Sequence, residues 1–301
     1  MDPIVLDLPV TPPILMRLHD DDELISRVLR RQRLWEAAST WFCLRHVRRG
    51  DHAVDVGANI GYYSLLLSRC VGVQGRVYAF EPEPLNLALL RVNLQINGCS
   101  NVVVHPLALA DTHGQRPLYL CPSNRGDHRL GFTPHRDMIT VPVTMADRCL
   151  GPRPARMDFV KIDVQGAEEL VLRGMRELIE KNRQCLTMLI ELSPSLLINV
   201  GSTYGSLLAL IEEMDGRYLL FDSWSPDAVS LREIEPAVIR GLAEEMLHSG
   251  VDDAFVNLVL VFSAEAMRRL HQRAELTQSE ERRIASDRCD KIAGPRAELR
   301  R

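Results

Sequence analysis

The hydrophobic pattern of the chain changes near Gly50. Between Asp20 and Arg49, acidic residues come first and apolar residues then recur at helical spacing, so we expect helix there, with a break before Leu34. After Gly50, short apolar runs alternate with amphipathic segments, which is typical of parallel strands joined by helical crossovers. The pattern therefore predicts an α/β, doubly wound and mostly parallel sheet behind a helical N-terminal extension.

Seven apolar runs account for the strands of this seven-stranded sheet. The runs expected as strands are 53–56, 76–80, 102–106, 159–162, 186–191, 218–221 and 258–262. The segments expected as helices are 62–70, 84–97, 167–181 and 204–214. The last two strands lack a regular helical crossover between them, so the sheet should end with an antiparallel, hairpin-like strand. Short inserted strands are expected at 118–120 and 140–143.

Composition places the chain among ordinary globular proteins. Its 301 residues are 46% hydrophobic with a formal net charge of -4, and they lack the basic surface of a nucleic-acid binder. None of the seven cysteines forms a C-x-x-C pair, which argues against a disulfide framework or a zinc site. We see neither a leader nor an apolar run of roughly 18 residues, and so expect a cytoplasmic protein that engages no membrane. The sequence leaves a homodimer open.

The chain is expected to divide into three parts. Residues 1–49 would form an arm and a helical lid, 50–263 the α/β domain, and 264–301 a charged helix and tail that is partly disordered. The lid would join residues 20–49 to the loop 123–136, because the open end of a doubly wound sheet leaves a bound ligand exposed to water.

A glycine turn and an acid at neighbouring strand ends predict a nucleoside site. The first strand runs through Asp55 into a turn at Gly57, Asn59 and Gly61, and glycines let the backbone approach a ligand closely. Glu81, followed by Pro82, ends the second strand about 20 residues further on, where an acid can accept the ribose hydroxyls of an adenosine.

The residues of the turn discriminate between two cofactors. A pyrophosphate loop has glycines where this chain has Asn59 and Tyr62, and Asp55 would repel phosphate but suit an ammonium group. This chemistry favours S-adenosylmethionine over NAD(P), although an NAD(P)-dependent oxidoreductase and a non-catalytic scaffold subunit stay as alternatives. The expected cofactor-binding residues from these elements are Asp55, Gly57, Asn59, Gly61, Tyr62, Glu81 and Pro82.

The fourth strand also ends in a carboxylate. Asp163 should face the same crevice as Gly57, and Lys161 in the strand is explained by an ion pair with a neighbouring acid. Glu168 lies in the first turn of the next helix, where it favours the helix dipole or reaches the site.

Three segments in this order resemble the FkbM family of S-adenosylmethionine-dependent O-methyltransferases. They are D-V-G-A-N-I-G-Y-Y-S at 55–64, F-E-P at 80–82 and K-I-D-V-Q-G-A-E-E-L-V-L-R-G at 161–174, and the likeness covers about 34–262. The family usually has glutamate where this chain has Gln165. The resemblance implies the Rossmann-like class I methyltransferase fold, S-adenosylmethionine as cofactor, and methylation of a hydroxyl on a small-molecule acceptor, commonly a natural product or a sugar.

Further residues are candidates for the site, most of them outside the three segments. Glu36 would contact the cofactor, and Ala108 and Leu109 would line the adenine. The residues expected to bind the acceptor are Trp35, Asn124, Asp127, Arg129 and Glu168. The candidate bases for an alcohol acceptor are Asp163, His128 and Glu191. Asp163 is also expected to bind the cofactor. Asp163, Glu168 and Glu191 could be imagined as Mg²⁺ ligands, but we expect no required metal.

Overall fold

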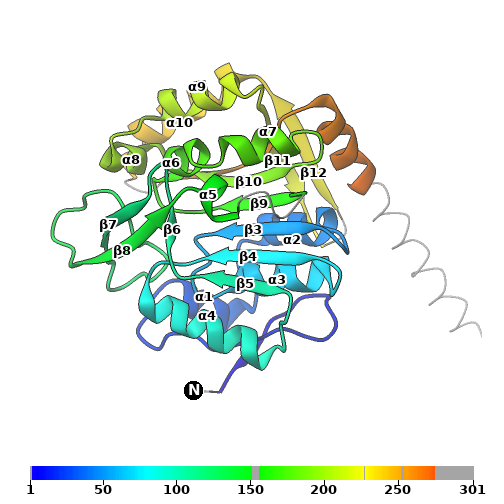
Figure 1. Ribbon diagram of the computed structural model, residues 1–301, viewed down its shortest axis with the longest axis vertical. Coiled ribbons are helices and arrows are strands. Elements are labelled where there is room, and N and C mark those ends of the chain that lie inside the picture. The colour runs from blue at the N-terminus through cyan, green and yellow to red at the C-terminus, as the bar shows by residue number, and fades with distance from the viewer. Residues whose placement is uncertain (1, 151–155, 227, 252–253, 275–301) are drawn as a thin grey trace, which may run out of the picture.

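A computed structural model describes residues 2–150, 156–226, 228–251 and 254–274. Its centre is an eight-stranded sheet in the order β12-β11-β13-β10-β9-β3-β4-β5 (Figure 1). The strands are β3 (His52–Val56), β4 (Arg76–Phe80), β5 (Val102–His105), β9 (Phe159–Ile162), β10 (Thr187–Leu192), β11 (Arg217–Trp224), β12 (Val229–Ile234) and β13 (Val256–Val261).

The sheet confirms the predicted fold class and adds one strand to it. All seven expected strands are present, and β13 lies antiparallel between β10 and β11. The strand β12 forms a hairpin with β11 at the edge, and α10 (Pro236–His248) follows it. We predicted a hairpin between the last two strands, β11 and β13. These strands are antiparallel neighbours, but β12 and α10 lie between them in the chain, so the prediction was incomplete. The strand β12 alternates apolar and polar residues over its first four positions, but it is six residues long and only Ile234 in it is buried.

Helices bury both faces of the sheet, as parallel strands require. In β3, Ala53 packs in one core cluster with residues of α3 (Tyr62–Val71) and α4 (Pro84–Ile96), and Val54 packs in the other. The second cluster contains α5 (Ala146–Leu150), α6 (Glu168–Arg173), α7 (Arg176–Asn182), α8 (Pro194–Leu197) and α9 (Tyr204–Glu213). The expected helix 167–181 is divided near Gly174, where an added Cβ would meet the Ala110 carbonyl oxygen at 2.0 Å.

The N-terminal segment is folded onto the first core cluster. It forms the hairpin β1 (Ile4–Val5) and β2 (Leu15–Met16), then α1 (Ile25–Gln32) and α2 (Ala37–His46). Arg33 and Glu36 adopt φ of 58° and 39°, so the helix breaks near the predicted point. Ile14, Met16, Leu29 and Phe42 are fully buried, which makes this segment part of the core.

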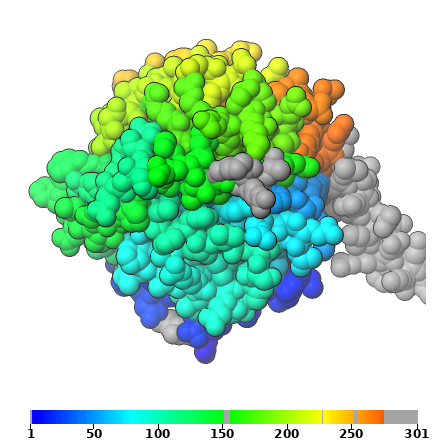
Figure 2. Space-filling model, viewed as in Figure 1, coloured from blue at the N-terminus to red at the C-terminus, as the bar shows by residue number. Residues whose placement is uncertain are grey.

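A separate three-stranded sheet projects as a lobe from the body (Figure 2). It contains β6 (Ala108–Leu109), β7 (Gly114–Tyr119) and β8 (Met138–Thr144), and it includes both short strands expected from the sequence. Its position matters for the site because β6 and the loop between β7 and β8 lie beside the ends of the main sheet.

The described part of the C-terminal segment is a helix over 264–274 that packs on the core through Ala266, Met267 and Leu270. The rest of the predicted tail, 275–301, lies outside the described residues. No single described helix is long and apolar enough to cross a membrane, although the bent pair Pro194–Val200 and Tyr204–Glu213 meets that test by length and composition.

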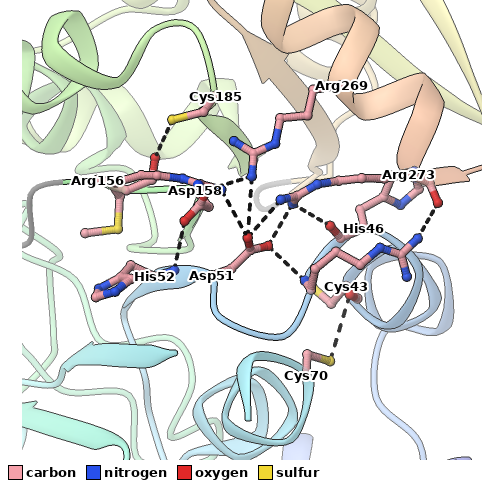
Figure 3. Close-up of polar contacts among 12 residues, drawn as sticks. Cys43, His46, Asp51, His52, Cys70, Arg156, Asp158, Cys185, Arg269 and Arg273 are labelled. Atoms are coloured by element: carbon pink, nitrogen blue, oxygen red, sulfur yellow. Dashed lines mark hydrogen bonds and ion pairs between the residues drawn. The ribbon is translucent and has the colours of Figure 1, made fainter. Parts of the chain in front are cut away.

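Arginines tie this helix to the amino ends of two central strands (Figure 3). Asp51 precedes β3 and Asp158 precedes β9, and both are buried. Arg273 donates to both oxygens of Asp51 at 2.7 and 2.8 Å, and Arg269 donates to Asp158 at 2.8 Å. Arg156 pairs with Asp158 at 2.5 Å. This ion-pair cluster neutralises two buried carboxylates at the end of the sheet opposite the cavity described next.

Candidate functional site

A cavity of about 290 Å³ opens at the carboxyl ends of β3, β4, β9 and β10. The start of α1, the α1–α2 junction, β6, β7 and the loop after β7 complete its wall. Its size lies at the lower end of ligand pockets, about 300–1,000 Å³, and carboxyl ends of parallel strands are where doubly wound sheets bind ligands.

The turn after β3 brings two strand ends into contact. Gly57 has φ of 83°, and a Cβ there would lie 2.0 Å from the Asp163 carbonyl oxygen. Only glycine fits this close approach of the β3 and β9 ends. Asn59, also left-handed at φ 48°, accepts a hydrogen bond from Ile60 N through its own Oδ1 at 2.6 Å. Contacts within the protein therefore define the shape of the turn.

Backbone donors hold the carboxylate of Glu81 in the same wall. Asn59 N donates to Oε2 and Glu83 N donates to Oε1, each at 2.8 Å. Burial raises the pKa of Glu81 to about 8, against the lowering effect of these donors. A hydroxyl donated by a ligand would find a fixed acceptor here, because each carboxylate oxygen keeps a further lone pair.

Three carboxylates from distant parts of the chain meet in the cavity. Glu36, Asp163 and Glu191 each offer an oxygen within 4.8 Å of the others. Burial raises the pKa of Glu36 and raises that of Glu191 well above its usual range, and Asp163 adds to both shifts. Such a cluster can accept a cationic ligand or a proton. Glu36 completes this set with Asp163 and Glu191, whereas Glu168, imagined with them as a Mg²⁺ ligand, is not part of it.

Lys161 and Gln165 hold this acidic cluster together. Lys161 donates to Asp163 Oδ2 at 2.8 Å, and Gln165 Nε2 donates to Asp163 Oδ1 and Glu191 Oε1 at 2.8 and 2.9 Å. Burial opposes the charge of Lys161, but the carboxylates of Asp163, Glu36 and Asp55 hold its pKa above the usual value. The cluster therefore combines three carboxyl groups with one permanent cation.

Aromatic residues place Glu36 in the cluster. Tyr63 OH donates to Glu36 Oε2 at 2.7 Å, and Trp35 Nε1 donates to Oε1 at 3.0 Å. The Lys161 ammonium lies 4.3 Å from the centre of the Tyr63 ring, a cation–π distance. The α1–α2 junction is thus fixed to the end of β9 through α3.

The loop after β7 supplies His128. Cys121 N donates to His128 Nδ1 at 3.0 Å, so the proton of the neutral ring is on Nε2. Burial lowers the pKa of His128, which favours that neutral form. With Nδ1 engaged and Nε2 protonated, the neutral ring has no lone pair left to take a substrate proton in this arrangement, so the role of His128 as a base stays a prediction.

The same loop is fastened to the start of α1. Arg125 N donates to Asp22 Oδ1 at 3.3 Å, and Glu23 N donates to the Ser123 carbonyl at 2.9 Å. Asn86 Nδ2, from α4, donates to the Arg125 carbonyl at 2.9 Å. These contacts bring together the two segments that were expected to form a lid.

Most of the predicted site residues line the cavity. Those that do are Trp35, Glu36, Gly57, Asn59, Tyr62, Glu81, Pro82, Ala108, Leu109, Asn124, Asp127, His128, Asp163 and Glu191. Their placement brings the cofactor, acceptor and base candidates into one cavity.

Four predicted residues do not line the cavity, and each has another contact. Asp55 is fully buried and accepts from Ser64 Oγ at 2.6 Å. Gly61 packs on α4, since a Cβ there would meet Leu90 Cδ1 at 2.5 Å. Arg129 pairs with Asp127 at 2.5 Å, and Glu168 accepts from Gly166 N at 3.0 Å within its own turn. These residues support the wall without forming it.

Sequence reasoning missed Tyr63, Gln165 and the ligand-facing position of Lys161. All three lie within the segments that carry the family resemblance. The sequence therefore identified these segments as part of the site, but it did not predict the contacts that these three side chains make. Tyr63 follows the glycine turn as an ordinary helical residue, and nothing local indicates that its hydroxyl reaches Glu36 across 27 positions.

The comparisons with known proteins agree with this geometry. The profile of the Methyltransferase FkbM domain matches residues 55–218. "Methyltransferase 1" of Beauveria bassiana is 27% identical over 143 residues, and "Methyltransferase sdnD" of Sordaria araneosa is 30% identical over 156 residues. These alignments cover 40% and 41% of this chain but 57% and 60% of those proteins, so the chain spans less than two thirds of either relative.

A solved structure bears the same family name. The crystal structure of a methyltransferase FkbM from Methylobacillus flagellatus KT is 20% identical, with a TM-score of 0.39, and the match covers 61% of this chain and 43% of that one. At that TM-score the superposition assigns no residue roles. The domain profile, however, spans more than half of the 301 residues. The chain belongs to the FkbM family of S-adenosylmethionine-dependent methyltransferases.

Proposed function

We propose that the chain is an O-methyltransferase that methylates a hydroxyl of a small-molecule acceptor. The observation that carries the proposal is the meeting of Glu36, Asp163 and Glu191 in one cavity beside the glycine turn. Lys161 pairs with Asp163, and a cationic ligand would favour the charged forms of Glu36 and Glu191, whose pKa values burial raises. Their negative charge fits a cofactor carrying a sulfonium and an ammonium group better than it fits a pyrophosphate.

Two parts of the wall would hold the cofactor. The fixed carboxylate of Glu81 suits ribose hydroxyls, and the apolar Ala108 and Leu109 suit the adenine. Glu36 and Asp163 suit the ammonium group. When bound, S-adenosylmethionine supplies an electrophilic methyl group, so the protein contributes mainly orientation and the exclusion of water.

In the proposed reaction, Glu191 accepts the proton of the acceptor hydroxyl. A hydroxyl must lose its proton as its oxygen takes the methyl group. The ionised form of Glu191, which a bound cationic cofactor would favour, is a stronger base because burial raises its pKa. Gln165 fixes one Glu191 oxygen, which leaves the other for the acceptor. In this arrangement His128 has no lone pair left for this role, because its Nδ1 is engaged.

Calorimetry with S-adenosylhomocysteine tests the cofactor site first. Glu81→Gln replaces one fixed acceptor oxygen by an amide donor, so we expect affinity to fall about 10- to 100-fold, the loss of one or two hydrogen bonds to a charged group. Glu83→Gln is the neighbouring control, since Glu83 does not line the cavity. Binding of NADH in place of S-adenosylhomocysteine would support the oxidoreductase, and binding of neither would support a scaffold.

The reaction itself is tested with labelled S-adenosylmethionine and a panel of alcohols. Glu191→Gln should lower turnover by about 10²-fold or more while cofactor affinity changes little, because removing a base affects the transition state. Transfer to an amine or a carboxylate, with none to any alcohol, would contradict O-methylation. The expectation that no metal is required stays a prediction, and loss of activity in EDTA with recovery in Mg²⁺ would overturn it.

A further inference from the structure

The loop after β7 is attached to the same residues that hold Glu81. The Arg125 carbonyl accepts from Asn86 Nδ2 at 2.9 Å and from Asn59 Nδ2 at 3.4 Å. Asn59 also donates its backbone N–H to Glu81 Oε2 at 2.8 Å. Asn86 N donates to Glu83 Oε2 at 2.6 Å, and Glu83 N donates to the other oxygen of Glu81. Two asparagines therefore connect the loop with the fixed carboxylate of Glu81.

Close packing brings the loop equally near to the turn after β3. A Cβ on Gly126 would lie 3.2 Å from Asn59 Nδ2 and 2.3 Å from Ile25 Cδ1. The backbone at Gly126 thus lies between the turn and α1, where a larger residue does not fit without a shift. The loop residues and the asparagines that hold them all line the cavity: Asn59, Asn86, Asn124, Arg125 and Gly126.

The order of strands separates this end of the cavity from the acidic cluster. Glu81 follows β4 and Glu191 lies in β10, and both β3 and β9 stand between these two strands. Three strand spacings amount to roughly 14 Å. Among the described residues, no hydrogen bond or ion pair joins 124–128 to the carboxylates of the acidic cluster. The contacts of the loop therefore place it at the Glu81 end.

We infer that the loop after β7 closes over the adenosine part of the cofactor and belongs to the cofactor site rather than to the acceptor site. The inference deepens the proposed function and rests on it, because that function places the ribose at Glu81 and the acceptor hydroxyl at Glu191. Asn124, which was expected to bind the acceptor, then lies beside the nucleoside.

A ligand that contains only part of the cofactor tests this in the wild-type protein. 5′-Methylthioadenosine keeps the nucleoside of S-adenosylhomocysteine but lacks its amino acid. Each ligand is added to saturation, as established by calorimetry, and amide hydrogen exchange is followed in 121–130. We expect both ligands to slow exchange in this segment by about 5-fold or more, because the nucleoside alone stabilises the closed loop. A loop that serves only the acceptor would keep its exchange rate with either ligand.

A substitution in the loop gives a second measurement. Gly126→Val removes no polar side chain from the wall, but its side chain cannot be placed between Ile25 and Asn59 without moving the loop. Affinity for 5′-methylthioadenosine and for S-adenosylhomocysteine should therefore fall by the same factor, about 10-fold. Gly241→Val in α10 is the matched control, because a Cβ there meets nothing within 4 Å. Both of its affinities should stay within about 2-fold of the wild type.

Several outcomes would overturn the inference. They are binding of 5′-methylthioadenosine without slower exchange in 121–130, unchanged affinities in Gly126→Val, and a loss in that variant confined to S-adenosylhomocysteine. Binding of S-adenosylhomocysteine without any binding of 5′-methylthioadenosine also counts against it, because the nucleoside would then have no site of its own. If the wild type binds neither ligand, the proposed function fails and the inference fails with it. The exchange experiment needs no variant, so it decides the question even if Gly126→Val does not fold.

Discussion

At the scale of single residues, Gln165 shows how the acidic cluster is kept intact. Its Nε2 donates to Asp163 and to Glu191, which are like charges that would otherwise repel each other. It does so from a left-handed backbone at φ 52°, directly before Gly166 at φ 100°. The amide of Gln165 therefore supplies two donors where a carboxylate would supply none.

Gln165→Glu should destabilise the protein more at pH 8 than at pH 5. The new carboxylate would remove both donors and raise the pKa of Glu191 further. A carboxyl group whose pKa is raised on folding stabilises below its unfolded pKa, about 4.3, and that stability is lost as pH rises through the folded value. We expect a loss of about 1–3 kcal/mol in the free energy of unfolding at pH 8, measured in urea.

The control for this experiment is Gln184→Glu, which makes the same change at an exposed position. It should alter the free energy of unfolding by less than about 0.5 kcal/mol at either pH. Equal losses at pH 5 and pH 8 for Gln165→Glu would contradict the electrostatic role.

At the scale of elements, Asp22 joins α1 to the loop after β7. Its Oδ2 accepts from Ser26 N at 2.6 Å at the start of α1, and its Oδ1 accepts from Arg125 N at 3.3 Å. Deleting residues 1–49 would be a poor test of a lid, because Leu29 and Phe42 belong to the core. A single substitution at the junction separates closure of the cavity from folding.

Asp22→Ala should loosen both segments and leave the fold intact. Loss of a capping acceptor costs about 1 kcal/mol, so amide hydrogen exchange should rise in 23–30 and 121–130, and S-adenosylhomocysteine should protect these segments less than in the wild type. Asp20→Ala, which breaks only the exposed pair with Arg30 at 3.2 Å, is the control. Exchange that stays unchanged in 121–130 would show that the two segments are independent.

At the scale of the whole molecule, the two ends of the sheet have different tasks. The carboxyl ends of β3 and β9 carry Gly57 and Asp163, and their amino ends carry Asp51 and Asp158 in the ion-pair cluster (Figure 3). Each strand is only four or five residues long, so the same short strands connect the cavity with the C-terminal helix. Stability and ligand binding should nevertheless respond separately to changes at the two ends.

Arg273→Ala should destabilise the protein without weakening cofactor binding. It removes two hydrogen bonds from buried Asp51 and one from the His46 carbonyl. Breaking a buried ion pair costs about 3–5 kcal/mol. We expect a loss near the lower value, because Arg269 lies 3.5 Å from Asp51 and still compensates its charge in the variant. Urea unfolding measures the loss, and calorimetry with S-adenosylhomocysteine should give an affinity within about 2-fold of the wild type.

Arg268→Ala in the same helix is the comparison, because its side chain is 70% exposed and, among the described residues, is paired with Glu265. Its free energy of unfolding should change by less than about 1 kcal/mol. Equal effects of the two substitutions would mean that the cluster does not anchor the helix.

The sequence alone determined the order of strands and helices and the three segments at the strand ends. These features depend on local patterns: apolar runs predict strands, glycines predict the turn at Gly57, and Glu81 follows its strand directly. The edge elements β12 and α10 were not predicted, although β12 alternates over its first four residues and α10 begins at a proline. β12 is six residues long and only Ile234 in it is buried, so its apolar signal is short.

Only the tertiary structure decided which carboxylates meet and what His128 can do. Glu36, Asp163 and Glu191 are brought together by the order of strands in the sheet and by the hydroxyl of Tyr63, contacts between residues far apart in the chain. Glu168 was expected to bind the acceptor, but its carboxylate accepts from the Gly166 amide within its own turn. His128 is a donor because a backbone amide seven positions away occupies its other nitrogen, and no residue pattern encodes that hydrogen bond.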